Sequence, residues 1–314
     1  MPLMEIFRAL AVLIEPLTEP KAVMRMGKLL GLGQLPTASE FTDTFVFQFY
    51  PYASVYLGAE GMFGGEARDR IAGFWRALGQ TPPAESDHLA VLLATYARLS
   101  SPEDENAVVS SCEGSYVVKG DSLHANVVEN ARGLEAARSV REAFLWEHLL
   151  SWLPVYLDRV AEVAPQFYRR WAELLTDALL EESRAARTPA ALPLHLREAP
   201  HVADPRGSTP GEFLQTLLAP ARSGLILVRS DLARAASSLG TVLRAGERKY
   251  ALRSLMGQDA RGTLGWLAVE ASRQAARHAR HRDTIGAIAD WWSARAAATE
   301  KLLRELESDA EGLS

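Results

Sequence analysis

The sequence lacks several features that would narrow its function at once. Its 314 residues include one cysteine, Cys112, which excludes an intramolecular disulfide, a cysteine-ligated iron–sulfur cluster and a zinc site built from cysteine pairs. A single cysteine suits a reducing cytoplasm. The longest apolar runs, such as residues 9–14, are far shorter than the roughly 20 residues that span a bilayer. Glu5 and Glu15 flank the first apolar run, so we expect a first helix there and no secretory signal.

Charge is spread unevenly along the chain. The net charge of −5 disfavours non-specific binding to nucleic acid. Residues 210–282 nevertheless hold twelve Arg or Lys against five Asp or Glu, a net charge of +7 (12 − 5). An acidic body joined to a basic segment indicates a charged partner or contact between the two halves, and solvated helix faces are the simpler interpretation.

Helical periodicity dominates the sequence, and no strand pattern competes with it, so the predicted fold is all-α. Apolar residues recur at i, i+3, i+4 and i+7 in two neighbouring segments, at 71–78 and 89–99. Thr37 and Glu40 form a capping box before a helix at Phe41. Ser86 or Asp87 is the expected N-cap of the helix that holds residues 89–99. The run from 144 to 156 is apolar around most of a helix, which is typical of a central helix in a bundle, and Pro154 should break it.

Composition divides the chain into three parts. Residues 1–182 read as one helical domain, with a polar insertion at 101–131 that forms a small hairpin or an irregular excursion. Residues 183–211 hold five prolines and little periodicity, which favours a linker. Residues 212–314 are again helical, and they form either a second module or an addition to the same bundle.

An aromatic turn spans residues 50–56, Tyr-Pro-Tyr-Ala-Ser-Val-Tyr, and a glycine-rich loop with glycines at 58, 61, 64 and 65 follows it. Tyrosines in such a loop can form a recognition surface, because each offers apolar area and a hydroxyl at low entropic cost. The alternative is that the tyrosines are core residues with tethered hydroxyl groups.

The order of these motifs resembles the TorD/DmsD/NarJ family. The resemblance rests on Glu40-Phe41, then Phe45-Val46, the stretch 51–56, Asp87-His88-Leu89 and a second hallmark at 144–154. It covers roughly residues 5–180. The family usually has glutamate three positions before the aspartate of the Asp-His pair. Here that position is Ala84, and the nearest acid is Glu85.

The resemblance implies a helical bundle of TorD/DmsD type, here with additional C-terminal helices. It implies a cytoplasmic chaperone without enzymatic activity that binds the twin-arginine leader, the apoprotein or both, of a molybdopterin oxidoreductase and assists cofactor insertion before export. It also suggests transient contact with guanine nucleotide or the molybdenum cofactor, although the sequence has no G-x-x-x-x-G-K-[ST] motif. The family includes helix-swapped dimers, so a homodimer is one state that the resemblance allows. Which oxidoreductase is served cannot be read from the sequence.

The resemblance also points to the residues that contact the client. The expected set borders one groove and consists of Tyr52, Ser54, Tyr56, Trp75, Pro83, Asp87 and His88. Asp87 is the candidate partner for a leader arginine, because a carboxylate can accept a bidentate pair of hydrogen bonds from a guanidinium. Tyr52, Tyr56 and Trp75 are candidates for the apolar part of the leader. The secondary candidates lie in the second hallmark and are Glu147, His148 and Trp152.

Three groups of residues allow alternatives to this hypothesis. Asp87 and His88 could form a catalytic dyad with Ser54 in a hydrolase, although no G-x-S-x-G context surrounds the serine. They could also simply begin a helix. His278 and His281 have metal-ligand spacing, but no nearby cysteine or acid completes a site, so we expect no metal. The segment 231–236, before Gly240, resembles the first helix of a helix-turn-helix, so a DNA-binding regulator that uses residues 229–282 is the rival function.

Overall fold

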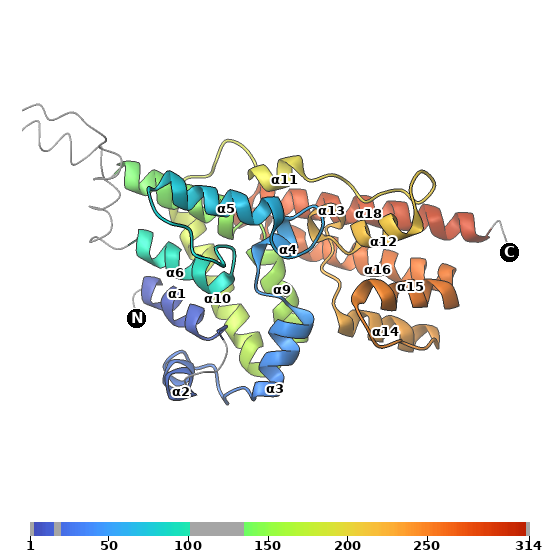
Figure 1. Cartoon of the computed structure of the whole chain (residues 1–314), viewed down its shortest axis with the longest axis horizontal. Helices are drawn as coiled ribbons and strands as arrows, with labels where there is room; N and C mark the ends of the chain where they lie inside the picture. The colour runs from blue at the N-terminus through green and yellow to red at the C-terminus, as the bar shows by residue number, and fades with distance from the viewer. Residues whose placement is uncertain (1–2, 16–19, 101–134, 312–314) are drawn as a thin grey trace, which may run out of the picture.

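The computed structural model describes residues 3–15, 20–100 and 135–311, and the predicted insertion at 101–131 lies outside them. Figure 1 shows the N-terminal helices at one end of an elongated molecule and the C-terminal helices at the other. In the described ranges no strand occurs, and the only β-type pairing is an isolated bridge between Tyr52 and His88. The predicted all-α fold is therefore confirmed.

Within the described ranges, the N-terminal half is built from helices and the loops that connect them. In chain order its elements are α1 (Leu3–Val12), α2 (Pro20–Leu29), α3 (Ala38–Phe41), the π-helix η1 (Thr42–Gln48), α4 (Ala53–Leu57), α5 (Gly65–Ala77), α6 (Leu89–Leu99), the helical residues 135–144, the π-helix η2 (Leu145–Leu149), α9 (Leu153–Val163) and α10 (Gln166–Ala185). Residues 144–156 are central, as predicted. The helix breaks before α9, where Pro154 lies in the first turn and needs no backbone N–H.

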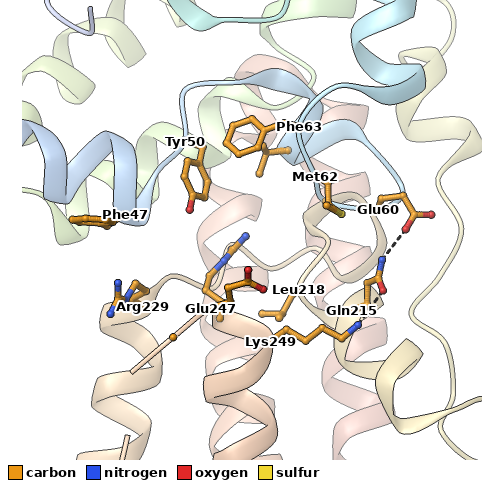
Figure 2. A pocket seen from close by; sticks show the side chains of 14 residues that line it. Phe47, Tyr50, Glu60, Met62, Phe63, Gln215, Leu218, Arg229, Glu247 and Lys249 are labelled. Carbon is orange, nitrogen blue, oxygen red and sulfur yellow. Dashed lines mark hydrogen bonds between the residues drawn. The ribbon is translucent and has the colours of Figure 1, made fainter. Parts of the chain in front are cut away.

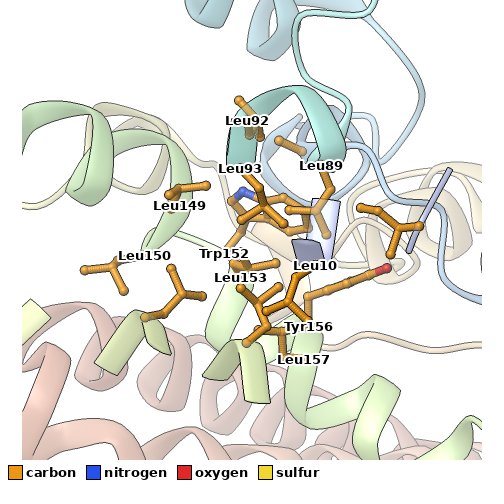
Figure 3. Close-up of a cluster of buried hydrophobic side chains, with 14 of the residues drawn as sticks. Leu10, Leu89, Leu92, Leu93, Leu149, Leu150, Trp152, Leu153, Tyr156 and Leu157 are labelled. Carbon is orange, nitrogen blue, oxygen red and sulfur yellow. The ribbon is translucent and has the colours of Figure 1, made fainter. Parts of the chain in front are cut away.

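The core of this half is a continuous cluster of buried apolar side chains. Figure 3 shows leucines of α6, α9 and the η2 region packed around Trp152 and Tyr156. Trp152 is fully buried, and its indole N–H donates to the His148 carbonyl oxygen over 2.9 Å. The stacked ring of Tyr56 covers Trp152, with ring centroids 5.1 Å apart. These aromatic contacts bind the turn at residues 50–56 to the centre of the bundle.

Two predicted helix starts had different outcomes. The capping box of Thr37 and Glu40 is present, since the Thr37 hydroxyl accepts from the Glu40 N–H and the Glu40 carboxylate accepts from the Thr37 N–H. The prediction that Ser86 or Asp87 caps α6 is wrong. His88 is the N-cap, and its Nδ1 accepts the Ala90 N–H over 3.2 Å. Asp87 is not available for this role, because its carboxylate accepts a hydrogen bond from the Ser54 backbone instead.

The C-terminal half is dominated by a helical hairpin. Its elements are α11 (Leu194–Glu198), α12 (Pro210–Leu217), α13 (Pro220–Ser223), α14 (Arg229–Leu239), α15 (Arg248–Gln258), α16 (Ala260–His278), the 3₁₀ helix η3 (Ala279–His281), α17 (Arg282–Ile285) and α18 (Ala287–Glu311). Helices α16 and α18 lie side by side in Figure 1. Gly286, with φ +47°, separates α17 from α18.

The two halves share one core. Ile226, Val228, Ile288 and Trp292 belong to the same buried cluster as the helices of the N-terminal half. The Trp292 indole N–H donates to the Ser151 carbonyl oxygen over 2.8 Å. A second cluster joins α12, α14, α15, α16 and α18 to one another. The C-terminal helices therefore pack directly against the N-terminal half.

The proline-rich segment at 183–211 lies against the body of the protein. Helix α10 extends into it as far as Ala185, and α11 lies within it. Leu196 is fully buried in the core, and Arg295 donates to the carbonyl oxygens of Ala199 and Pro200. The division into residues 1–182 and 212–314 stays a prediction. None of the described helices combines the length and the apolar character needed to cross a membrane.

Candidate functional site

The aromatic turn and the Asp-His segment lie directly against each other. Tyr52 and His88 form the isolated antiparallel bridge. On either side of it, the Ala53 N–H donates to the Asp87 carbonyl oxygen over 3.0 Å and the Leu89 N–H donates to the Pro51 carbonyl oxygen over 2.8 Å. The structure therefore brings together two segments whose proximity the resemblance implied, although 33 residues separate Ser54 from Asp87 in the chain.

Two of the expected client-binding residues hold this junction from the inside. Asp87 is 2% exposed, and its carboxylate accepts the Ser54 N–H over 3.3 Å. Ser54 is fully buried, and its hydroxyl accepts the Gly64 N–H over 3.0 Å. Both side chains fasten backbone of the turn and of the glycine-rich loop, so neither faces solvent in this conformation.

The outer face of the junction is a row of four rings. Tyr50 and Phe63 make edge contact with centroids 4.9 Å apart, Phe63 and Tyr52 with centroids 5.1 Å apart, and Tyr52 and His88 with centroids 4.8 Å apart. Phe63 is 56% exposed, although large apolar side chains are normally buried. Sequence reasoning missed Phe63. The available signal was its place as the only aromatic residue in the glycine-rich loop.

Carboxylates border one end of this aromatic row. The exposed Glu85 accepts a hydrogen bond from the Tyr52 hydroxyl over 3.0 Å. Burial, together with this bond to Glu85, raises the pKa of Tyr52 to about 12. Burial lowers the pKa of His88, while the nearby Glu85, Glu15 and Asp87 act in the opposite direction. His88 is therefore neutral near pH 7, and its surroundings are negatively charged.

A pocket of about 400 Å³ opens beside the row of rings. Its lining residues come from η1, the aromatic turn, the glycine-rich loop, the start of α5 and the loop before α6, and they are Phe45, Val46, Tyr50, Tyr52, Phe63, Gly64, Arg68, Ala84, Glu85 and Asp87. Val46 is exposed on the π-helix η1, a type of helix often found at functional sites. An apolar wall next to the exposed Glu85 carboxylate suits a ligand with a cation followed by apolar groups.

The remaining expected residues lie away from this pocket or beneath it. Tyr56 and Trp152 are stacked in the core, and Trp75 is buried under the guanidinium of Arg98. Pro83 is half-buried in the loop before α6.

The secondary candidates Glu147 and His148 are engaged within the protein. The Glu147 carboxylate accepts the Leu194 N–H over 3.0 Å. His148 packs against Phe74 and Phe144, and burial lowers its pKa to about 3. These site assignments stay predictions.

The rival functions find no support in the arrangement of their residues. In the described ranges no hydrogen bond joins Ser54 to His88, and the Ser54 hydroxyl is used to hold Gly64. In the basic segment, Arg273 and Arg277 of α16 are paired with Glu162 of α9.

His278 at the end of α16 and His281 of η3 also face inward. His278 is fully buried and its Nε2 lies 3.0 Å from the Gly224 carbonyl oxygen, while His281 contacts Asp158. This face is turned to the protein interior and is closed to a DNA backbone.

Comparison with known proteins agrees with the resemblance. The family model described as nitrate reductase delta subunit matches residues 21–158. A protein named chaperone protein TorD from Vibrio vulnificus (strain YJ016) is 29% identical over 133 residues, which cover 41% of this chain and 54% of that protein. The protein of the same name from Vibrio cholerae serotype O1 (El Tor Inaba N16961) is 27% identical over 137 residues, covering 41% and 52%.

The chain thus spans about half the length of the curated relatives it matches. No solved structure matches. The matched segment contains the whole junction between the aromatic turn and the Asp-His pair, as well as η2 and the start of α9. Through its residues 21–158, this chain is similar to the nitrate reductase delta subunit family and to the chaperone proteins TorD.

Proposed function

We propose that the protein is a cytoplasmic, non-enzymatic chaperone that binds the leader peptide of a molybdopterin oxidoreductase and holds the apoprotein until its cofactor is inserted. The match of residues 21–158 to the nitrate reductase delta subunit family and the name of the similar proteins, chaperone protein TorD, support this role. The observation that carries the leader-binding part is the exposed Phe63 ring between Tyr50 and Tyr52, next to the Glu85 carboxylate.

The site provides the two kinds of contact that a twin-arginine leader needs. A leader arginine pairs with Glu85, because a guanidinium and a carboxylate form charge-assisted hydrogen bonds in a bidentate geometry. The negative surroundings of His88 favour the second arginine. The apolar stretch that follows lies against Phe63 and Val46, which the folded chain leaves exposed. Large exposed apolar patches of this kind mark binding surfaces in soluble proteins.

Titration with a labelled twin-arginine peptide tests the proposal directly. Glu85→Gln should weaken binding about tenfold, since a hydrogen bond to a charged group contributes roughly 1.5–3 kcal/mol. Phe63→Ala should weaken it by a similar factor through lost apolar contact. A peptide with lysines in place of both arginines should lose most of the Glu85 effect, because an ammonium cannot make the bidentate pair.

Asp69→Asn is the matched control, since Asp69 is an exposed carboxylate of α5 that lies outside the lining of this pocket. It removes one negative charge, as Glu85→Gln does, and should leave the affinity unchanged. Equal affinity of the wild-type protein and both site variants, with circular dichroism showing that they are folded, would refute the assignment of the leader to this pocket.

Substitution of Asp87 should affect stability and not the leader contact itself. Because its carboxylate is buried and holds the Ser54 N–H, Asp87→Ala leaves a buried donor without a partner. We expect a loss of about 1–3 kcal/mol of unfolding free energy. Leader binding should fall only in step with the folded fraction. A folded Asp87→Ala variant with weak leader binding would instead restore Asp87 as the arginine partner.

A further inference from the structure

The C-terminal helices form one wall of a second pocket, so residues 21–158 alone would not enclose it. This pocket has a volume of about 550 Å³. It shares Tyr50 and Phe63 with the 400 Å³ pocket beside the row of rings, which we call the leader pocket. In Figure 2 one wall carries Phe47, Tyr50, Met62 and Phe63, and the opposite wall carries Gln215, Leu218, Arg229, Glu247 and Lys249. The first wall lies within residues 21–158, and the second lies outside them. We call it the composite pocket.

The two walls are fixed to each other before any ligand arrives. Gln215 links them, because its amide donates to Glu60 over 2.8 Å and its carbonyl oxygen accepts from Lys249 over 3.0 Å, as the dashed lines of Figure 2 show. Gly61 touches α13 so closely that an added Cβ would lie 2.8 Å from the Ala219 Cα. A preformed pocket spares a ligand part of the cost of ordering its site.

The aromatic wall is more exposed than a folded protein normally allows. Met62 is 63% exposed and Phe47 is 47% exposed, and both face the composite pocket. They add to the exposed Phe63 on the shared edge. Apolar side chains left open in one hollow indicate a partner that brings apolar groups of its own.

The opposite wall is positively charged. Between residues 241 and 258 the chain has four basic side chains, Arg244, Arg248, Lys249 and Arg253, against the single acid Glu247. Arg229 adds another cation at the rim, where its guanidinium lies over the Phe47 ring, 5.8 Å from the centroid. In the described part of the chain Arg229 has no carboxylate partner. Glu60, the other acid of the lining, is held by Gln215.

We infer that the composite pocket binds an acidic, apolar stretch of the client polypeptide, in which a large apolar side chain stands beside carboxylates. The apolar side chain packs against Phe47 and Met62, and the carboxylates pair with Arg229 and its basic neighbours. This inference rests on the proposed chaperone function for its partner, but it uses different residues from the leader site. The two sites have opposite charge and meet at Tyr50 and Phe63, so one client chain can occupy both.

Fluorescence anisotropy with short labelled peptides tests the pocket. One peptide has a central Phe-Leu pair flanked by glutamates, and its match has glutamines instead. The full-length wild-type protein should bind the acidic peptide at least about fivefold more tightly at low ionic strength, and added salt should reduce the difference. Arg229→Gln should remove most of it, and Phe47→Ala should weaken both peptides about tenfold.

Arg244→Gln is the matched control, because Arg244 is exposed on the same basic stretch but does not line the pocket. Equal losses in Arg229→Gln and Arg244→Gln would overturn the proposal in favour of general attraction to a basic surface. Tighter binding of random duplex DNA than of the acidic peptide, removed by Arg229→Gln, would also overturn it. So would an acidic peptide that binds no better than its glutamine match.

The leader peptide separates this inference from the proposed function. Phe47→Ala and Arg229→Gln should leave twin-arginine binding unchanged, since neither residue lines the leader pocket. Glu85→Gln should weaken the leader and leave the acidic peptide unchanged. If only the expected results with the twin-arginine peptide fail, the proposed function is contradicted. If only the expected results with the acidic peptide fail, the proposal for the composite pocket is contradicted.

Discussion

Arg159 of α9 and Asp231 of α14 form a fully buried ion pair, with both carboxylate oxygens 2.7 Å from one guanidinium nitrogen. Asp231 also accepts the Val228 N–H, and Arg159 donates to the Ile226 carbonyl oxygen. The pair therefore joins α9 of the N-terminal half to α14 of the C-terminal half. Arg159→Met should lower the unfolding free energy by about 3–5 kcal/mol, because it removes the buried guanidinium and leaves the buried Asp231 carboxylate only the exposed Arg234 as a partner.

Denaturant unfolding of the single and double variants checks this pair. The double variant Arg159→Met, Asp231→Leu should recover much of the loss, because two apolar side chains replace the pair without leaving a lone charge. A loss below about 1 kcal/mol in Arg159→Met would show that the pair is as weak as an exposed one.

Trp292 and Trp291 offer a matched test of the shared core. Trp292 is buried in the N-terminal cluster and donates to Ser151, whereas Trp291 is half-buried with Arg295 over its ring. Trp292→Ala should cost about 3–5 kcal/mol of unfolding free energy, with a single transition for the whole chain. Trp291→Ala should cost clearly less. Two separate unfolding transitions in the wild-type protein would argue for independent modules.

Alanine variants of Gly61 and Gly65 distinguish the effect of backbone strain from that of the contact between the glycine-rich loop and Ala219. Both have positive φ, at +61° and +67°, so alanine at either position costs about 1–2 kcal/mol of left-handed strain. Only at Gly61 would the new Cβ meet α13, since nothing lies within 4 Å at Gly65. Gly61→Ala should therefore be the more destabilised in thermal unfolding and should also weaken the acidic peptide. Equal effects of the two variants would mean that the loop does not depend on this contact.

His278 predicts a loss of stability in acid. Burial lowers its pKa to about 4, against about 6.5 in an unfolded chain. As the pH falls from 6.5 towards 4, the unfolded chain takes up a proton that the folded chain does not. The unfolding free energy should then fall by about 1.4 kcal/mol per pH unit from this residue. Urea unfolding at several pH values should show a shallower slope for His278→Gln, and an unchanged slope would contradict the assignment.

Local signals predicted the helices because their causes lie within a few residues. Thr37 and Glu40 satisfy each other's backbone groups, Pro154 starts a helix that it could not continue, and Gly240 ends α14 in the left-handed conformation. The N-cap of α6 was misplaced for a non-local reason. Asp87 has the usual chemistry of a cap, but Ser54, 33 residues away, takes its carboxylate.

The sequence predicted that two segments meet at the candidate site, but it did not predict which of their side chains are exposed. The resemblance implied that residues 51–56 and 87–88 lie together, and the bridge between Tyr52 and His88 agrees with it. Which carboxylate reaches solvent depends on packing. Glu85 and Asp87 are two positions apart, yet Glu85 is exposed and Asp87 is buried.

The sequence by itself determined the helical class, some helix ends and the similarity of residues 21–158 to the TorD/NarJ family, because periodicity, caps and motif order depend on neighbouring residues. Only the tertiary structure decided that the C-terminal helices share the core, that Phe63 is exposed, and that Phe47 and Arg229 face one hollow. Those facts depend on contacts between residues more than a hundred positions apart, and burial there is set by the whole packed surface.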